Sequence, residues 1–270
     1  MILIFNVGGT TTKAALSQDG QTLADVWSFD TPRDFEKWLF VLSEETGKRL
    51  KGKAVEKVCG GIAGVWDVKK TKIFKSPNLP DWEGELIKKQ IESQFAAKVL
   101  LDNDVVMEGL GEARVGAGRR KQIVAFLGIG TGIGGVKLVD GKISPAAYGS
   151  EPGHMIIEAD GEVGYWENFA SGAAMEHMYG KKPEEIDDVQ IWDSELKLLA
   201  VGIQNVIMMW SPEIIIFGGG VSNKLDFEKL ATLVKQEMIM FPKLPEMVVS
   251  ELGDKSGLYG ALEYIKIASL

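Results

Sequence analysis

Residues 2–20 read ILIFNVGGTTTKAALSQDG, and residues 123–141 read IVAFLGIGTGIGGVKLVDG. Each stretch begins with an apolar, β-branched run that predicts a buried strand, continues through a glycine-rich break, and ends with a second strand at Asp-Gly. The Asp19-Gly20 pair is typical of a type I′ hairpin turn. Two strand–glycine–strand hairpins, one opening each half of the chain, predict two α/β halves with a cleft between them.

The remaining elements follow from hydrophobic periodicity. We expect further strands over residues 21–29, 55–63, 97–101 and 213–217. We expect helices over residues 34–50, 83–95 and 105–113, over four turns ending before Pro212, and from about residue 257 onward. The sequence therefore predicts strands that alternate with helices in both halves.

The composition excludes several classes of partner. The chain has 270 residues, a formal net charge of −8 and a sequence pI near 5.0, which argues against nucleic acid as the main partner. Cys59 is the single cysteine, so no internal disulfide is possible and a reducing, cytoplasmic location fits. The N-terminus lacks the features of a signal peptide, and the longest uncharged runs, 122–136 and 198–212, are shorter than a membrane span of about 20 residues.

Three glycine-rich turns follow buried strands, at residues 8–9, 128–135 and 218–220. Such turns bring backbone N–H groups close to a phosphate because glycine has no Cβ, although each could also be a plain tight turn. Residues 130–135 match the dinucleotide pattern G-x-G-x-x-G, but a strand follows them where that pattern needs a helix. No Gly-Lys pair is followed by Ser or Thr, so a P-loop is absent.

Nine segments, in order along the whole chain, resemble the ROK family of sugar kinases and related repressors, within the actin/hexokinase superfamily. They are NVGGTTTK (6–13), GGIAGVWD (60–67), SPNLPDW (76–82), DNDVVMEGLGE (102–112), GIGTGIGG (128–135), EPGHM (151–155), WENFASG (166–172), IIIFGGGVS (214–222) and GDKSGLYGAL (253–262). The resemblance implies a two-lobed actin-like (ribonuclease H-like) ATPase fold with a central cleft. It divides the chain into a small lobe, 1–103 with 256–270, and a large lobe, 104–255.

The resemblance also implies a function. We expect an ATP-dependent hexose kinase, with glucokinase as the first expectation, that phosphorylates the sugar 6-hydroxyl, uses Mg²⁺ and forms a homodimer. Phosphoryl transfer to a hydroxyl needs a carboxylate as general base, and the register of the motif favours Asp104 over Asp102. The same residues could also cap the helix that follows.

The remaining site residues come from matching the family's motifs position by position. Expected sugar contacts are Gly64, Asn78, Asn103, Glu151, His154 and Glu167. Expected nucleotide and phosphate contacts are Gly8, Gly9, Thr10, Thr12, Lys13, Gly130, Thr131, Gly132, Gly134, Gly219 and Gly220.

Two departures from the family's pattern concern metals. Asn6 stands where the first phosphate loop usually has an Asp that helps to place Mg²⁺; it can act through a metal-bound water but brings no charge. Glu158, Asp160 and Tyr165 occupy the positions of the family's zinc-binding cysteines, so we predict no structural zinc. The sequence starts at the first phosphate loop, which is expected of a kinase and not of a DNA-binding repressor.

Three alternatives stay open at this stage. Asn6 leaves room for a sugar-binding sensor without turnover, some zinc-free relatives use polyphosphate as the donor, and the G-x-G-x-x-G match keeps a nicotinamide-dependent dehydrogenase as a weaker alternative. The sequence does not determine the preferred hexose, the choice among ATP, ADP and polyphosphate, the effect of Asn6 on turnover, or the oligomeric state.

Overall fold

The fold is described from a computed structural model that covers residues 1–159, 161–238 and 240–268. The first glycine turn connects two antiparallel strands, β1 and β2, of a five-stranded sheet. The sheet order is β3-β2-β1-β4-β7, and β4 and β7 run parallel to β1. Its strands are β1 (Ile2–Val7), β2 (Thr11–Ser17), β3 (Ala24–Asp30), β4 (Lys57–Ile62) and β7 (Lys98–Asp102). A small hairpin, β5 (Val65–Trp66) and β6 (Ile73–Lys75), follows β4.

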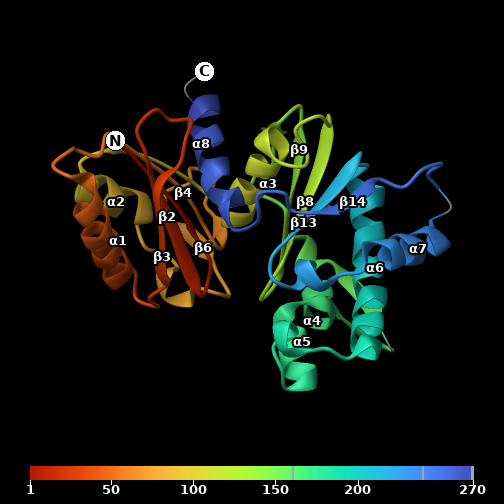
Figure 1. The fold of residues 1–270 in the computed structure, drawn as a ribbon. Helices are drawn as coiled ribbons and strands as arrows, with labels where there is room; N and C mark the ends of the chain where they lie inside the picture. The colour runs from red at the N-terminus through yellow and green to blue at the C-terminus, as the bar shows by residue number, and fades with distance from the viewer. Residues whose placement is uncertain (160, 239, 269–270) are drawn as a thin grey trace. The chain divides into compact units, whose positions relative to one another are not determined.

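The alternation of side chains along β1 divides the helices between the two faces of this sheet. Leu3, Phe5 and Val7 join a core with residues of α1 (Phe35–Leu50) and α2 (Ile87–Phe95). Ile4 packs on the other face, in a core with Met107 of α3 (Asp104–Val115) and the apolar side of α8 (Ser256–Ala268). Figure 1 shows α8 on the opposite side of the sheet from α1 and α2. Asn6 therefore belongs to the face that α3 and α8 cover.

Glycines let α8 and α3 approach each other closely. A Cβ on Gly260 would lie 1.7 Å from the backbone oxygen of Met107, and one on Gly111 would lie 2.2 Å from the backbone oxygen of Ser256. Any larger residue at either position would force the two helices apart. The helix that carries Asp104 is thus held by backbone-to-backbone packing.

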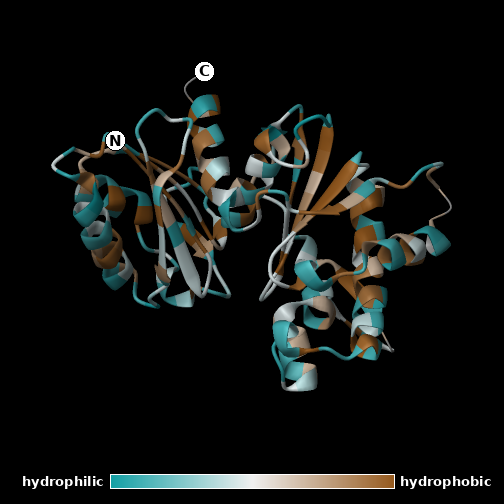
Figure 2. Ribbon diagram, in the orientation of Figure 1, coloured by the Kyte–Doolittle hydropathy of each residue, from teal (hydrophilic) through white to brown (hydrophobic). Residues whose placement is uncertain are grey.

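A second sheet has the same plan, with the order β10-β9-β8-β13-β14. An antiparallel hairpin is again followed by two parallel strands. The strands are β8 (Ile123–Ile129), β9 (Ile133–Val139), β10 (Lys142–Ile143), β13 (Ile214–Gly218) and β14 (Glu246–Val249). The predicted repeat of the strand–glycine–strand hairpin is confirmed, and Figure 2 shows hydrophobic residues concentrated on the strands of this second sheet.

Helices α6 (Val189–Trp210) and α7 (Phe227–Glu237) share a hydrophobic core with the second sheet. Leu199, Ile203 and Val206 of α6 pack with Leu127 and Phe217 of the central strands. The other elements of this part are β11 (Ile156–Ala159), β12 (Glu162–Tyr165), α4 (Trp166–Ala170) and α5 (Gly172–Tyr179). Short 3₁₀ helices lie at Pro80–Trp82 (η1), Pro152–His154 (η2), Pro183–Glu185 (η3), Val221–Lys224 (η4) and Gly253–Lys255 (η5).

The chain folds as two compact units. One contains residues 1–114, 145–149 and 254–270, and the other contains residues 115–144 and 150–253. Helix α3 lies in the first unit, whereas the division predicted from sequence assigned residues 104–255 to the large lobe. The division into a small lobe, 1–103 with 256–270, and a large lobe, 104–255, stays a prediction. Within the described residues, no helix is long and apolar enough to cross a membrane.

Two local predictions were wrong. A type I′ turn needs positive φ at both central residues, but of Asp19 and Gly20 only Gly20 has positive φ, at 68°. Asp19 instead accepts backbone N–H groups from Gln21 and Thr22, both at 2.8 Å, so a longer loop joins β2 to β3. Helix α2 begins at Ile87 and not at residue 83, because Gly84 takes a φ of 81° and its N–H donates to the carbonyl of Ile73.

Candidate active site

The first glycine turn packs against a predicted sugar-contacting residue. Gly9 lies so near Asn78 that a Cβ would come within 2.8 Å of the Asn78 Cβ. The turn is closed by the Gly8 N–H, which donates to the Thr11 carbonyl at 3.0 Å, and Thr10 is exposed at its tip. The structure thus brings Gly8, Gly9, Thr10 and Asn78 together in the first unit.

Thr12 follows the turn but has its side chain in the core. Its residue is fully buried, and its hydroxyl accepts from Trp38 Nε1 at 3.0 Å and lies 2.9 Å from the Thr31 hydroxyl. A contact from Thr12 to a nucleotide would therefore use its backbone. Lys13, one residue later, is partly exposed, and its ammonium contacts Asp254 at 2.5 Å.

Asp104 is the first residue of α3, directly after β7. Asn103 caps this helix, since its Oδ1 accepts the N–H groups of Val105 and Val106 at 2.8 and 3.2 Å. Its Nδ2 donates to the Gly64 carbonyl at 3.1 Å, which joins two predicted sugar contacts. The cap and the catalytic interpretation coexist: the amide that ends the strand fixes the backbone from which the Asp104 carboxylate projects.

Three neighbouring groups hold Asp102. It is 6% exposed and accepts from three donors: Lys70 Nζ at 2.6 Å, the Asn103 N–H at 2.8 Å and the Tyr264 hydroxyl at 3.3 Å. These contacts tie the β5–β6 hairpin and α8 to the end of β7. Asp102 is therefore an anchor for the strand end that precedes Asp104.

Asn6 is 8% exposed and lies between β4 and α3. Its Nδ2 donates to Glu108 Oε1 at 3.1 Å, while its Oδ1 has no hydrogen-bond partner in the part of the chain that the structure describes. Burial, with a smaller contribution from the Asp104 carboxylate, raises the pKa of Glu108 to about 8, and Lys13 opposes this rise. Sequence reasoning missed Glu108; its signal was the spacing of four residues from Asp104, which places both on one side of a helix.

The second glycine turn joins β8 to β9 and is held by the segment that follows β12. Glu167 Oε2 accepts the Ile133 N–H at 3.1 Å. A Cβ on Gly132 would approach the same oxygen to 2.7 Å, so a larger residue there would displace the Glu167 carboxylate. The N–H groups of Gly172 and Ala173 donate to the carbonyls of Gly130 and Thr131 at 2.7 and 3.2 Å. Because a strand follows the turn, the helix that a dinucleotide motif needs is absent from this place.

The third glycine turn lies beside the second. Gly219 has a φ of 84°, and a Cβ there would come within 2.3 Å of the Ile129 carbonyl and 3.0 Å of the Gly130 nitrogen. Gly220 follows and leads into η4. Two of the three predicted phosphate-contacting turns are therefore neighbours within the second unit.

Three predicted sugar ligands also converge in the second unit. His154 lies between Glu151 and Glu167, with its Nδ1 3.9 Å from Glu151 Oε2 and its Nε2 3.7 Å from Glu167 Oε1. These distances exceed a hydrogen bond, and all three side chains are partly exposed. Burial and, to a smaller extent, the Glu167 carboxylate raise the pKa of Glu151, and His154 partly opposes this rise. Separated acceptors and donors of this kind can each bind a hydroxyl of a polyol.

Close packing fixes Glu167 in this group. Trp166, next to it, is fully buried, donates from Nε1 to the Leu198 carbonyl at 3.1 Å, and lies against Gly202 of α6. A Cβ on Gly202 would come within 2.0 Å of the indole ring. The core of the second unit thus orients the Glu167 side chain, which serves both the glycine turn and the candidate sugar ligands.

The predictions about zinc and Mg²⁺ concern different residues. Of the positions that match zinc-binding cysteines, Glu158 and Tyr165 lie on the β11–β12 hairpin, and Asp160 lies outside the described residues. Among residues 1–159, 161–238 and 240–268, no group of three His, Cys, Asp or Glu side chains could hold a metal ion. Mg²⁺ needs only one or two carboxylates when water and phosphates complete its shell, so Asn6, with its buried unpaired oxygen, and the neighbouring carboxyls fit that ion.

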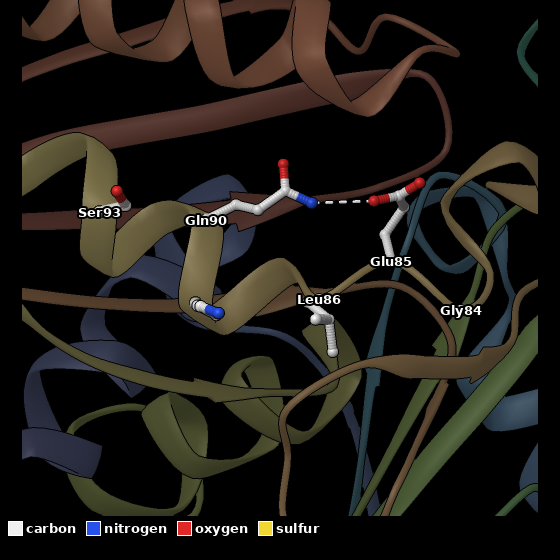
Figure 3. A pocket seen from close by; sticks show the side chains of 6 residues that line it. Gly84, Glu85, Leu86, Gln90 and Ser93 are labelled. Atoms are coloured by element: carbon white, nitrogen blue, oxygen red, sulfur yellow. Dashed lines mark hydrogen bonds between the residues drawn. The ribbon is translucent and has the colours of Figure 1, made fainter.

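A shallow depression lies at the start of α2. Figure 3 shows its lining residues, with Gln90 Nε2 donating to Glu85 Oε2 at 2.8 Å. Its lining contains none of the predicted site residues. The candidate site is therefore defined by convergent polar groups and glycine turns.

Comparison with known proteins identifies the family. The sequence profile of the ROK family matches residues 3–267, and the chain belongs to this family. It is 29% identical over 304 residues to a glucokinase of Thermotoga maritima, covering 97% of this chain and 96% of that protein. It is 26% identical over 295 residues to an N-acetyl-D-glucosamine kinase of Aliivibrio fischeri, covering 95% of this chain and 96% of that protein.

A solved structure shows the same fold. A ROK family glucokinase from Streptomyces griseus, in complex with glucose and AMPPNP, superposes with a TM-score of 0.83 at 24% identity, over 97% of this chain and 98% of that one. The fold is the actin-like ATPase fold expected from the sequence.

Proposed function

We propose that the protein is an ATP-dependent hexose kinase that phosphorylates the 6-hydroxyl, with glucose as the first substrate to test. The observation that carries the proposal is the position of Asp104 at a capped helix start, next to the carboxyl end of a parallel strand. Catalytic groups of α/β folds lie at such strand ends. The sugar kinases among its relatives, and the AMPPNP bound to one of its structural neighbours, support a sugar acceptor and a nucleotide donor.

In this reaction the Asp104 carboxylate accepts the proton of the sugar hydroxyl as the hydroxyl oxygen attacks the terminal phosphorus. The oxygen–phosphorus bond to the sugar forms while the bond to the leaving diphosphate breaks, which yields a sugar phosphate and ADP. Asp102 is occupied by three donors, so its role is to fix the strand end and not to accept the proton.

The candidate sugar contacts fall in two sets, and each set lies within one unit. Asn103 has its Oδ1 committed to the helix cap, so its remaining amide N–H is available for a hydroxyl. Gly64, whose carbonyl accepts from Asn103 Nδ2, and Asn78, which packs against Gly9, belong to the first unit. Glu151, His154 and Glu167 belong to the second unit, where they offer donors and acceptors. The positions of Glu151, His154 and Glu167 suit a ligand with several neighbouring hydroxyls.

The phosphates of the donor would be bound by the glycine turns, because backbone N–H groups without a neighbouring Cβ can approach a phosphate closely. Lys13 would add a positive charge beside the first turn. When bound with the nucleotide, Mg²⁺ neutralises charge on the phosphates, and Asn6 would help to hold it through a water molecule. Gly134, Gly219 and Gly220 complete the proposed donor side.

A coupled assay tests the proposal. Glucose and N-acetyl-D-glucosamine are crossed with ATP, ADP and polyphosphate, and sugar phosphate is measured with the spent donor. We expect glucose and ATP to give equal amounts of glucose 6-phosphate and ADP. If glucose binds in calorimetry but no donor is consumed, the protein is a sensor; if only polyphosphate is consumed, the nucleotide part of the proposal is wrong.

The proposal includes a homodimer in the cytoplasm. Light scattering of the purified protein should give twice the chain mass of 29.5 kDa. Cell fractionation should recover the protein with cytoplasmic enzymes. A monomer at working concentration would remove the dimer from the proposal without affecting the chemistry.

A further inference from the structure

The side chain of Asn6 is held in one place by close packing. A Cβ on Gly61 would come within 2.3 Å of Asn6 Oδ1, and one on Gly257 would come within 2.4 Å of Asn6 Cγ. The amide is therefore confined between β4 and the start of α8. With more than nine-tenths of the residue buried and Oδ1 unpaired among the described residues, Asn6 leaves a polar oxygen whose hydrogen-bonding capacity the protein itself does not use. A buried unpaired oxygen is costly unless a ligand, an ion or water completes it.

Glu108 is the protein group that Asn6 contacts. The 3.1 Å hydrogen bond from Asn6 Nδ2 to Glu108 Oε1 joins the end of β1 to α3 across 102 residues of sequence. Glu108 lies four residues after Asp104, so the two carboxyls occupy the same side of α3, one turn apart. Two carboxyls and an unpaired amide oxygen thus gather at the end of the strand that leads into the first glycine turn.

Lys13, whose charge acts on Glu108, is shared with another carboxylate. The Lys13 ammonium is engaged with Asp254 at 2.5 Å. The Asp104 carboxylate, one helical turn away, disfavours charge on Glu108, and a bound cation would favour it. Oxygen ligands that include one or two carboxylates are the kind that Mg²⁺ selects, with water and phosphates completing the shell.

We propose that Glu108 is a further residue of the phosphoryl-transfer site, whose carboxylate, beside the Asn6 amide, positions the divalent cation that accompanies the nucleotide. The inference rests on the proposed function. Asn6 carries no charge, and Glu108 would supply one across a single hydrogen bond once a bound cation displaces its proton. Glu108 is thus a positioning residue for the donor, distinct from Asp104, which acts on the acceptor.

The alternative is that Glu108 serves only as a hydrogen-bond acceptor for Asn6. Glu108→Gln separates the two roles because glutamine keeps an acceptor oxygen and the side-chain length but removes the charge. Calorimetry of AMPPNP binding, with and without Mg²⁺, and Mn²⁺ binding followed by electron paramagnetic resonance both report on the cation without turnover. We expect Glu108→Gln to weaken the Mg²⁺-dependent affinity about 10–100-fold, the usual effect of losing a group that orients a metal. Affinity for AMPPNP without Mg²⁺ and for glucose should be unchanged.

A transposed variant and a control make the test specific. Asn6→Asp/Glu108→Gln moves the carboxylate to the other side of the same hydrogen bond and should regain most of the lost affinity. Glu36→Gln removes an exposed carboxylate from the first turn of α1, on the opposite face of the sheet, and should have no effect. If Glu108→Gln does not fold, Glu108→Asp keeps the charge but withdraws it by one methylene, and should weaken the Mg²⁺-dependent affinity by a smaller factor.

Several outcomes would overturn the inference. Unchanged Mg²⁺-dependent affinity in a folded Glu108→Gln or Glu108→Asp variant would do so, and so would an equal loss with and without Mg²⁺. A transposed variant no better than Glu108→Gln would show that charge is not what Glu108 contributes. If the wild-type protein phosphorylates no sugar but Glu108→Gln still loses Mg²⁺-dependent binding, the proposed function fails and the inference about Glu108 stands.

Discussion

Asp102 and Asp104 are two residues apart, and replacing each by asparagine should damage different properties of the protein. Asp104→Asn keeps the size of the side chain but removes the proton acceptor. We expect kcat to fall about 10²–10⁴-fold, the usual worth of a general base. That range corresponds to about 2.7–5.4 kcal/mol of transition-state stabilisation. KM should change little, because the sugar contacts remain and the lost interaction belongs to the transition state.

The stability of Asp104→Asn should change little. Asp104 begins α3, so loss of its charge removes a favourable interaction with the helix N-terminus, worth about 0.3–1 kcal/mol. At about 2–4 °C per kcal/mol for a chain of this size, Tm should fall by no more than about 4 °C.

Asp102→Asn should show the reverse pattern. Asparagine loses the charge that Lys70 and the Asn103 N–H share through Oδ1, and charge-assisted hydrogen bonds are worth about 1.5–3 kcal/mol. Because the Lys70 side chain is 28% exposed and can turn to solvent, the cost stays below that of breaking a fully buried pair. Tm should therefore fall by about 3–12 °C, while kcat of the folded enzyme stays within about tenfold of wild type.

The assay measures steady-state kinetics and thermal unfolding of both variants side by side, well below the lower Tm. If Asp104→Asn keeps nearly full kcat while Asp102→Asn is inactive with an unchanged Tm, the two roles are reversed. The general base would then be the residue that the structure shows bound to Lys70 and Tyr264.

Three more predictions concern stability. Burial raises the pKa of Glu195 from its ordinary 4.5 to about 8, so the unfolded chain releases this proton at a lower pH than the folded protein does. The free energy of unfolding should therefore fall as the pH rises from about 5 to about 8. Urea titrations at both pH values should show a smaller fall for Glu195→Gln, and an identical fall would contradict the assignment. Gly260→Ala should lose at least about 3 kcal/mol, because its Cβ would lie 1.7 Å from the Met107 carbonyl, and a wild-type Tm in this variant would disprove the close packing of α8 on α3. Purified protein should contain no stoichiometric zinc and a chelator should leave Tm unaltered; about one zinc per chain by elemental analysis would refute this.

The features that were predictable from sequence depend on neighbouring residues. An apolar run followed by glycines and a second strand identifies a hairpin, and both central hairpins formed where expected. The helices also formed, since their apolar spacing reflects the face that each one buries. The start of α2 was misjudged because periodicity does not register the positive φ of Gly84 or the hydrogen bond from its N–H to Ile73.

The features that were not predictable depend on contacts between distant segments. Glu108 contacts Asn6 because strand alternation directs Asn6 to the face that α3 covers, and because α3 packs there in the orientation that turns Glu108 toward Asn6. The anchoring of Asp102 by Lys70 and Tyr264 likewise joins three segments. No local pattern encodes such a meeting, and the choice of Asp104 as the general base, made from motif register, stays a prediction.

Helix α8 has a consequence for the order in which the chain folds during synthesis. Its residues Leu258, Ala261 and Ile265 share a core with Ile4 of the first strand, and Gly260 seats the helix against α3. During synthesis, the face of the first sheet that α8 covers therefore stays exposed until nearly all the remaining residues have been made. The second unit, whose residues lie between these partners, can finish folding first, which inverts the usual order in which N-terminal parts fold earliest. We expect the nascent first unit to need protection from aggregation until α8 leaves the exit tunnel.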